Sequence, residues 1–313
     1  MLAKSLLQDS SGYIARKRFA LAAIPIVIFI IYGLLVEPFW IEIRHIKICD
    51  PDLAPAFEGL TIVQVSDIHL DGGGVLDKLR QQRLSVILSR LSPDLILLTG
   101  DYAQWGADPR LAIDFVSTLR ATYGVYGVLG DADYSYGGPE YCQFCHPSGD
   151  YQRLRMVPRF LDKDWTCMDQ RSSAFAILGL SIRGGEEEPS EIARRLSEID
   201  IRCGREIPII ILAHSSALIK ELTASERLKL SKRPALILSG DTHGGQIRLP
   251  VWFWRLTGLK PDPDHMTGLY RLDSHLWLYV NRGIGTTIRL PFRIGVRPEV
   301  TVFRFERDEE KTR

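Results

Sequence analysis

The sequence predicts a layered α/β domain that follows an apolar, membrane-spanning N-terminal segment. Two observations predict the domain: short apolar strands alternate with helical segments from Thr61 onward, and Asp or His follows five of these strands. Ligands of open α/β sheets bind beyond the carboxyl ends of the strands, which is where these polar residues fall. With 313 residues, the chain can bury one large core or two small ones.

The N-terminal segment differs from the rest of the chain because Phe19–Val36 contains no charged residue. Eighteen such residues suffice to cross a bilayer. We therefore expect residues 19–36 to anchor the protein in the cell (inner) membrane as a single-pass helix. Arg16, Lys17 and Arg18 precede the run, which predicts a cytoplasmic basic tail at residues 1–18 and an extracytoplasmic main domain. The run is too long for a typical signal peptide and too uniformly apolar for a one-sided core helix.

The remaining elements follow in chain order. Residues 37–60 form a juxtamembrane linker in which Trp40–Ile48 alternates like a half-buried strand. The main domain covers residues 61–306, and residues 307–313 form a polar tail. The expected strands of the main domain are Thr61–Val65, Leu95–Leu98, Gly124–Leu129, Phe175–Leu180, Ile207–Leu212, Ala235–Leu238, Gly268–Leu272, Leu276–Val280 and Glu299–Phe305. Its expected helices lie around Val75–Leu91, Pro109–Leu119 and Tyr151–Phe160, from a cap at Ser190 through Ile199, and around Ser216–Leu230.

Carboxylates and imidazoles gather at the ends of five strands. They are Asp67 and His69, then Asp101, then Asp131 and Asp133, then His214, and finally Asp241 and His243. In a continuing strand, residues two apart share a face, so Asp67 and His69 are expected to reach the same ion. A single Asp after a strand is most often a helix cap, but the repeated pattern predicts one cluster that holds two divalent cations.

The order of these motifs resembles the calcineurin-like metallophosphoesterases. That family shows Asp-x-His, Gly-Asp, Gly-Asn-His-Asp, His and Gly-His-x-His, and this chain has Asp-Ile-His, Gly-Asp, Gly-Asp-Ala-Asp, His and Gly-Asp-Thr-His in the same order. The segment Tyr279–Thr287 and the Gly-Gly-Gln after His243 look like the membrane-anchored subgroup. The resemblance implies a four-layer α/β/β/α sandwich of two mixed sheets.

The resemblance also implies a role for each site residue. Asp67, His69 and His243 would hold one metal, Asp101 would bridge, and Asp131, His214 and Asp241 would hold the second. Asp101, Asp131 and Asp133 would form the catalytic group. The metal pair would activate a water for attack on the phosphorus of a phosphodiester or pyrophosphate.

Three positions depart from the family pattern: Asp131 replaces Asn, Asp241 replaces His, and Ala132 replaces the His that helps to protonate the leaving group. The two added carboxylates favour Mn²⁺ or Mg²⁺ over Zn²⁺. The loss of a general acid favours phosphoanhydrides or activated diesters as substrates. The alternative is a degenerate metallophosphoesterase fold that acts as a non-catalytic binding or regulatory protein.

The expected partner is a membrane lipid or a lipid-linked phosphate substrate. Arg248–Leu256 places Trp252, Phe253 and Trp254 between two Arg, which is typical of a membrane interface but also of a buried hairpin. One membrane-associated branch of the family hydrolyses UDP-diacylglucosamine in lipid A synthesis, although that chemistry is cytoplasmic. A net charge of +1 argues against nucleic acid, and no obligate protein partner is evident.

The five cysteines include Cys142-Gln-Phe-Cys145-His146, which matches a haem c attachment sequence. A local disulfide, a zinc site and free thiols remain equally open interpretations. A haem there would instead indicate an electron-transfer or sensor protein.

Overall fold

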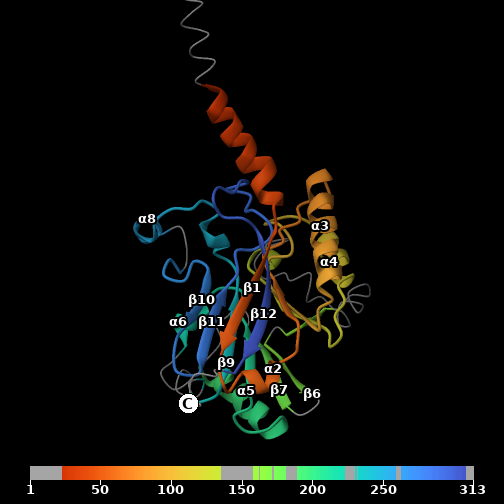
Figure 1. Cartoon of the computed structure of the whole chain (residues 1–313), viewed down its shortest axis with the longest axis vertical. Coiled ribbons are helices and arrows are strands. Elements are labelled where there is room, and N and C mark those ends of the chain that lie inside the picture. Colours follow the sequence, from red (N-terminus) through yellow and green to blue (C-terminus); the bar gives the residue numbers. More distant parts are fainter. Residues whose placement is uncertain are drawn as a thin grey trace, which may run out of the picture.

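Two six-stranded sheets lie face to face in the computed structural model (Figure 1). The model describes residues 23–134, 158–161, 163–170, 173–180, 189–222, 230, 232–258 and 262–307. The first sheet has the order β1-β12-β2-β3-β4-β5. Its strands are β1 (Glu42–Cys49), β2 (Ile62–Val65), β3 (Leu95–Thr99), β4 (Val125–Val128), β5 (Arg159–Phe160) and β12 (Glu299–Glu306).

The second sheet has the order β10-β11-β9-β8-β7-β6. Its strands are β6 (Trp165–Gln170), β7 (Ser173–Gly179), β8 (Ile209–Leu212), β9 (Ala235–Ser239), β10 (Gly268–Arg271) and β11 (Leu276–Val280). Both sheets are mixed, because antiparallel pairs join β12 to β2, β10 to β11, and β6 to β7, whereas the other neighbours are parallel.

Three apolar cores separate the layers. The central core joins the inner faces of the sheets, with Leu97 of the first packed in the same cluster as Ile210 of the second. An outer core lies between the first sheet and helices α3 (Val75–Leu91) and α4 (Arg110–Ser117). A third core joins the second sheet to α5 (Pro189–Arg202) and α6 (Leu218–Glu221). The four-layer α/β/β/α arrangement expected from the resemblance is therefore confirmed.

The segment expected as a linker contributes an edge strand to the first sheet. β1 pairs in parallel with β12 over eight residues, from Glu42 opposite Glu299 to Cys49 opposite Glu306. β12 in turn runs antiparallel to β2. The start of β1, where the N-terminal helix enters the domain, therefore lies at the same end of the sheet as the carboxyl end of β2.

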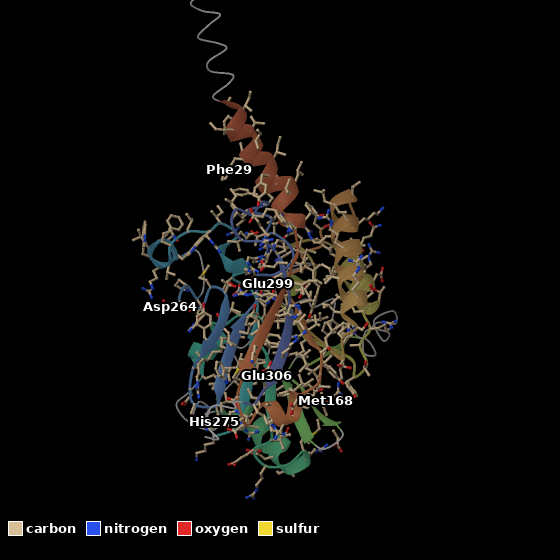
Figure 2. All side chains as sticks on the ribbon, in the orientation of Figure 1. Phe29, Met168, Asp264, His275, Glu299 and Glu306 are labelled. Atoms are coloured by element: carbon tan, nitrogen blue, oxygen red, sulfur yellow. A yellow bond between two sulfur atoms is a disulfide. The ribbon has the colours of Figure 1, made fainter. Side chains whose placement is uncertain are left out.

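The N-terminal helix projects from that end of the molecule (Figure 1). Its described part begins at residue 23 and continues through η1 (Tyr32–Val36) into η2 (Glu37–Phe39). Phe29 lies on this helix away from the domain, whereas Glu299 is inside it (Figure 2). Within the described part of the chain, no helix is long and apolar enough to cross a membrane. Residues 19–22 of the expected anchor lie outside the described residues.

Every strand expected from Trp40 onward is present, but several other elements differ from expectation. β5, β6 and the short helix α2 (Ala54–Phe57) were not expected. The helix expected around Tyr151–Phe160 falls mostly outside the described residues, and its last two residues form β5. Ser190 lies within α5 rather than capping it, and the described part of the next helix covers only Leu218–Glu221. The hairpin interpretation of Arg248–Leu256 is wrong, because Val251–Thr257 forms helix α8.

A disulfide joins Cys167 of β6 to Cys203, which follows the last turn of α5. It links the edge of the second sheet to the helix that covers it. Cys142, Cys145 and His146 of the haem-like motif lie outside the described residues.

Candidate metal centre

The loops that follow β2, β3, β4, β8 and β9 meet at the end of the sandwich that carries the N-terminal helix. Backbone hydrogen bonds tie them together: the Asp67 N–H donates to the Gly100 carbonyl at 3.0 Å, and the Gly240 N–H donates to the His214 carbonyl at 2.8 Å. The predicted ligands therefore come together from both sheets, which the positions of the strand ends led us to expect.

One group of predicted ligands consists of Asp67, His69 and His243, all buried, with one ligand atom from each within 4.8 Å of the others. The Nε2 atoms of His69 and His243 lie 3.1 Å apart. His243 Nε2 also lies 3.5 Å from Oδ1 of Asp67. Two imidazole nitrogens and a carboxylate oxygen thus converge on one point.

A second group consists of Asp67, Asp101 and His214, which are also buried and within the same mutual distance. His214 Nε2 lies 3.5 Å from Oδ1 of Asp101, while the other oxygen of Asp101 lies 3.3 Å from His69 Nε2. His214 Nδ1 is 2.7 Å from the Thr99 carbonyl. Because that carbonyl can only accept, Nδ1 carries the proton and the lone pair of Nε2 faces the carboxylates.

The separations of these atoms fit cations between them. Two ligand atoms that bind one cation at about 2.1 Å lie about 3.0–3.4 Å apart on adjacent corners of an octahedron or a tetrahedron. The distances of 3.1–3.5 Å between the facing atoms match that spacing. His214 Nε2 is buried and has no hydrogen-bond partner among the described residues. A cation is the partner that such an inward-facing nitrogen lacks.

Asp131 and Asp241 stand at the open side of this cluster. The Asp131 side chain is 53% exposed, with Oδ1 3.5 Å from His214 Nε2. Asp241 is half-buried, and its backbone N–H donates to Asp67 at 3.0 and 3.3 Å. Neither residue belongs to the two convergent groups among the described residues. Both lie beside the cluster without completing it.

Asp133 has a different place from the one that the resemblance implied. Its carboxylate accepts hydrogen bonds at 2.9–3.1 Å from the backbone N–H groups of Asp101, Tyr102, Ala103 and Gly130. Four donors saturate the two oxygens, so the carboxylate holds the loops after β3 and β4 together. This geometry makes Asp133 a positioning residue, whereas the sequence indicated a member of the catalytic group.

The backbone of the site is conformationally unusual. Five of the predicted ligands, Asp67, His69, Asp101, Asp241 and His243, have positive φ angles between 49° and 68°. Such conformations cost about 1–3 kcal/mol each and cluster where function requires them. Glycines allow the loops to approach: a Cβ at Gly130 would lie 2.0 Å from Oδ1 of Asp101, and one at Gly240 would lie 2.2 Å from Oδ2 of Asp67. β2 ends at Val65, so this turn, and not a continuing strand, brings Asp67 and His69 together.

Comparison with known proteins identifies the family of this centre. The family model described as calcineurin-like phosphoesterase matches residues 60–245, which span all of the loops just described. The chain belongs to the calcineurin-like phosphoesterase family.

Its relatives in this family include a protein named as transmembrane and bacterial metallophosphoesterases. The chain is 27% identical to a transmembrane protein with metallophosphoesterase domain from Danio rerio over 91% of its own length, and spans 62% of that protein. It is 29% identical to the uncharacterized metallophosphoesterase YkuE of Bacillus subtilis, over 87% of this chain and 88% of the relative. It is 30% identical to the UDP-2,3-diacylglucosamine pyrophosphatase LpxG of Chlamydia muridarum, but over only 37% of this chain and 35% of the relative.

Ala132, one of the positions that depart from the expected family pattern, is buried and contacts the centre through its backbone. The Ala132 methyl group is buried, and its N–H donates to Oδ1 of Asp101 at 2.9 Å and to Oδ1 of Asp131 at 3.1 Å. The backbone of this family loop therefore keeps its contact with the centre, while the side chain offers no proton.

Burial is the main cause of the shifted pKa values at the centre of the site. Burial raises the pKa of Asp67 to about 6 and raises the pKa of Asp101 well above its usual range, with Asp131 and Asp133 adding to the shift of Asp101. Burial lowers the pKa of His69 to about 3, which keeps this imidazole neutral and able to bind a cation.

The pKa values of His214 and Asp131 shift in the opposite sense to those of His69 and Asp67. Burial opposes the charged form of His214, but the nearby carboxylates of Asp101 and Asp131 raise the His214 pKa well above normal. Burial alone would raise the pKa of Asp131, yet the nearby imidazole of His214 brings it down to about 2. Asp131 is therefore ionised at any physiological pH.

Sequence reasoning missed Arg293, which supports the centre from behind. The residue is fully buried, and its Nη2 lies 3.3 Å from Nδ1 of His243. It also donates to the carbonyls of Gly285 and Arg282. Burial lowers the pKa of Arg293 to about 9, with the charge of Asp67 opposing the shift. No local pattern distinguishes this Arg from the exposed ones.

Proposed function

We propose that this protein is a metal-dependent phosphoesterase that hydrolyses a phosphodiester or pyrophosphate bond. The observation that carries the proposal is the pair of adjacent, buried ligand groups. They share Asp67, and Asp101 lies within 3.5 Å of a histidine from each group. Two divalent cations bound there supply a water activated for attack on phosphorus and stabilise charge on the phosphoryl oxygens.

Each residue then has a defined task. Asp67, His69 and His243 would hold the first cation, and His214, Asp131 and Asp241 would hold the second at the open side. Asp101 directs one oxygen toward His69 and the other toward His214, an arrangement suited to a bridging ligand. Arg293 fixes the loop behind His243 by donating to the Arg282 and Gly285 carbonyls, and Asp133 fixes the loop of Asp101.

The open side favours Mn²⁺ or Mg²⁺ over Zn²⁺. In this assignment the second cation would have the carboxylates of Asp101, Asp131 and Asp241 and a single imidazole, that of His214. Oxygen ligands of this kind suit harder cations than the nitrogen- and sulfur-rich sites that hold zinc.

The substrate class follows from the missing proton donor. Ala132 has no acidic group, and the low pKa of Asp131 keeps that carboxylate ionised. A leaving group that needs no proton, such as a nucleotide or an aryl oxide, is therefore released with less loss of rate than an alkoxide.

The apolar N-terminal helix supports attachment to a membrane. The large apolar side chains between Ile24 and Ile31 are 48–62% exposed, which is costly in water and favourable in lipid. Trp252 and Leu256 of α8 are 63% and 79% exposed, and α8 lies toward the same end of the molecule as the helix (Figure 1). We propose that both contact the bilayer.

The disulfide bears on the side of the membrane. Such bonds persist in oxidising compartments, so the Cys167–Cys203 pair supports an extracytoplasmic main domain. A lipid-linked phosphate at the outer face fits this placement better than UDP-diacylglucosamine, which is made in the cytoplasm. The limited coverage of the similarity to LpxG agrees with that preference.

The test combines metal content and hydrolysis on one sample of the full chain in detergent. We expect about two Mn²⁺ per chain and turnover of bis-p-nitrophenyl phosphate and of a nucleotide pyrophosphate. Two bound metals with no turnover of any phosphodiester or pyrophosphate would instead favour the non-catalytic binding role that Ala132 raises. Protein that binds no metal would contradict both.

A further inference from the structure

A cavity of about 340 Å³ lies between the metal centre and the N-terminal helix. His69 forms part of its wall, and Leu34 and Pro38 of the N-terminal segment form another part. A molecule in this cavity therefore contacts a metal-ligand side chain and the apolar helix at the same time. The volume lies at the small end of the range of sites for small molecules, about 300–1,000 Å³.

The mouth of the cavity is apolar and exposed to solvent. Val75 and Leu76 at the start of α3 are 82% and 48% exposed, and Ile288 is 63% exposed. Three large apolar side chains from two distant parts of the chain thus surround one opening. Clusters of this kind mark sites that cover apolar ligands or meet lipid.

Two charged residues of the cavity wall, Arg80 and Asp77, pair with each other. Arg80 Nη1 pairs with Asp77 at 3.2 Å, and the guanidinium lies 5.6 Å from the centre of the Phe39 ring. Asp77 also accepts the backbone N–H groups of residues 71–73. The charge of Arg80 is thus balanced by Asp77, and we assign the anionic group of a ligand to the metal centre.

We propose that this cavity holds the apolar chain of a lipid phosphate ester whose phosphorus lies at the metal centre. The inference rests on the proposed function, because the metal centre is what holds the phosphate. The chain of such a lipid passes from the bilayer along the exposed apolar side chains of the N-terminal helix to Leu34 and the cavity. The cavity has room for one chain, so the substrate presents a single apolar chain to this wall.

A series of p-nitrophenyl phosphodiesters whose second ester group is methyl, butyl or octyl tests the proposal. The full chain is loaded with Mn²⁺ and held in phospholipid nanodiscs. Burial of several methylenes leads us to expect kcat/KM to rise at least about tenfold from methyl to octyl. Ile288→Asp places a charge at the mouth and is expected to abolish this rise while turnover of the methyl ester is retained.

Ile201→Asp is the matched control, because Ile201 is 83% exposed at the end of α5, far from the N-terminal helix (Figure 1). Partition of the octyl ester into lipid affects all variants equally, so only a contribution from the cavity separates Ile288→Asp from Ile201→Asp. Binding of octylphosphonate and methylphosphonate, followed by calorimetry, supplies a readout that does not depend on turnover.

The outcomes distinguish this inference from the proposed function. Equal turnover of methyl and octyl esters, or a preference that survives in Ile288→Asp, would overturn the cavity assignment and leave the phosphoesterase intact. If no ester were hydrolysed, the proposed function would fail. In that case, tighter binding of octylphosphonate that is lost in Ile288→Asp would still support the cavity, and chain-independent binding would overturn it.

Discussion

The two halves of the metal centre differ in burial and in how closely they keep the family pattern. Asp67, His69 and His243 are no more than 4% exposed and match the family residue types. The other half contains both acidic substitutions, at Asp131 and Asp241, whose side chains reach solvent. An extra carboxylate in the buried half would lose its hydration, whereas at the open side water screens it. The comparison teaches that negative charge accumulates where solvent can stabilise it.

The largest expected effect comes from removing the residue between the halves. Asp101→Ala deletes both oxygens that face His69 and His214, and we expect turnover of bis-p-nitrophenyl phosphate to fall about 10³-fold. Rates and bound Mn²⁺ are measured on the same preparation. Asp114→Ala, at an exposed position of α4, is the matched control and should behave like the wild type. Activity retained in Asp101→Ala would remove the bridge from the scheme.

Restoring the family proton donor tests the open half. Ala132→His is expected to raise hydrolysis of a poor leaving group, such as an alkyl phosphodiester, by about 10²-fold, at the lower end of the effect of general acids. Hydrolysis of a p-nitrophenyl ester should change little, because its leaving group needs no proton. The ratio of the two rates is the measurement. An unchanged ratio would mean that protonation does not limit the reaction.

The metal preference should follow the substituted carboxylates. The double variant Asp131→Asn with Asp241→His restores the family ligands, and we expect it to shift relative affinity from Mn²⁺ toward Zn²⁺ by about tenfold. Competition between the two metals, quantified by mass spectrometry, reports the shift. A preference that stays with Mn²⁺ would place its origin in the buried half.

The smallest effect is a change in thermal stability on removing the metals. At about 100 times its Kd, Mn²⁺ should raise the melting temperature by roughly 5–10 °C. The folded pKa of Asp67, about 6, lies above the ordinary value of 3.8, so the metal-free fold holds more protons than the unfolded chain between these values. Its stability therefore falls as pH rises from about 4 to 6, and the gap to the metal-bound form widens. Scanning calorimetry at several pH values measures this gap, and a constant gap would contradict the raised pKa of the buried Asp67 carboxyl.

Much of the fold follows from the sequence because buried strands are short apolar runs with clear ends. β9 and β11 follow such runs closely, and α3 has the bounds that its pattern indicates. Helix α8 was missed because five of its seven side chains are aromatic or β-branched, on a surface where only Trp254 is buried. A local pattern that short does not distinguish a helix from a hairpin.

The residues of the site were predictable, but their roles only in part. Asp67, Asp101, His214 and His243 converge as the strand ends indicated. The role of Asp133 depends on four backbone N–H groups from two loops, and that of Arg293 on carbonyls of residues 282–285 and of Val296. Such contacts arise from tertiary packing and leave no mark in the neighbouring sequence. The left-handed backbone at Asp67 and His69 was hidden for the same reason.

The position of β12 has a consequence for how the chain acquires its structure. This strand lies between β1 and β2 in the sheet, although it is the last strand along the chain. As the ribosome adds residues, the edge of β1 that β12 will cover stays unpaired until Glu299–Glu306 has been made. Closure of the first sheet is therefore a late event that depends on contacts between residues more than 200 apart in sequence, and such long-range pairing slows folding. During that interval, an N-terminal helix already held in lipid would keep β1 away from other nascent chains.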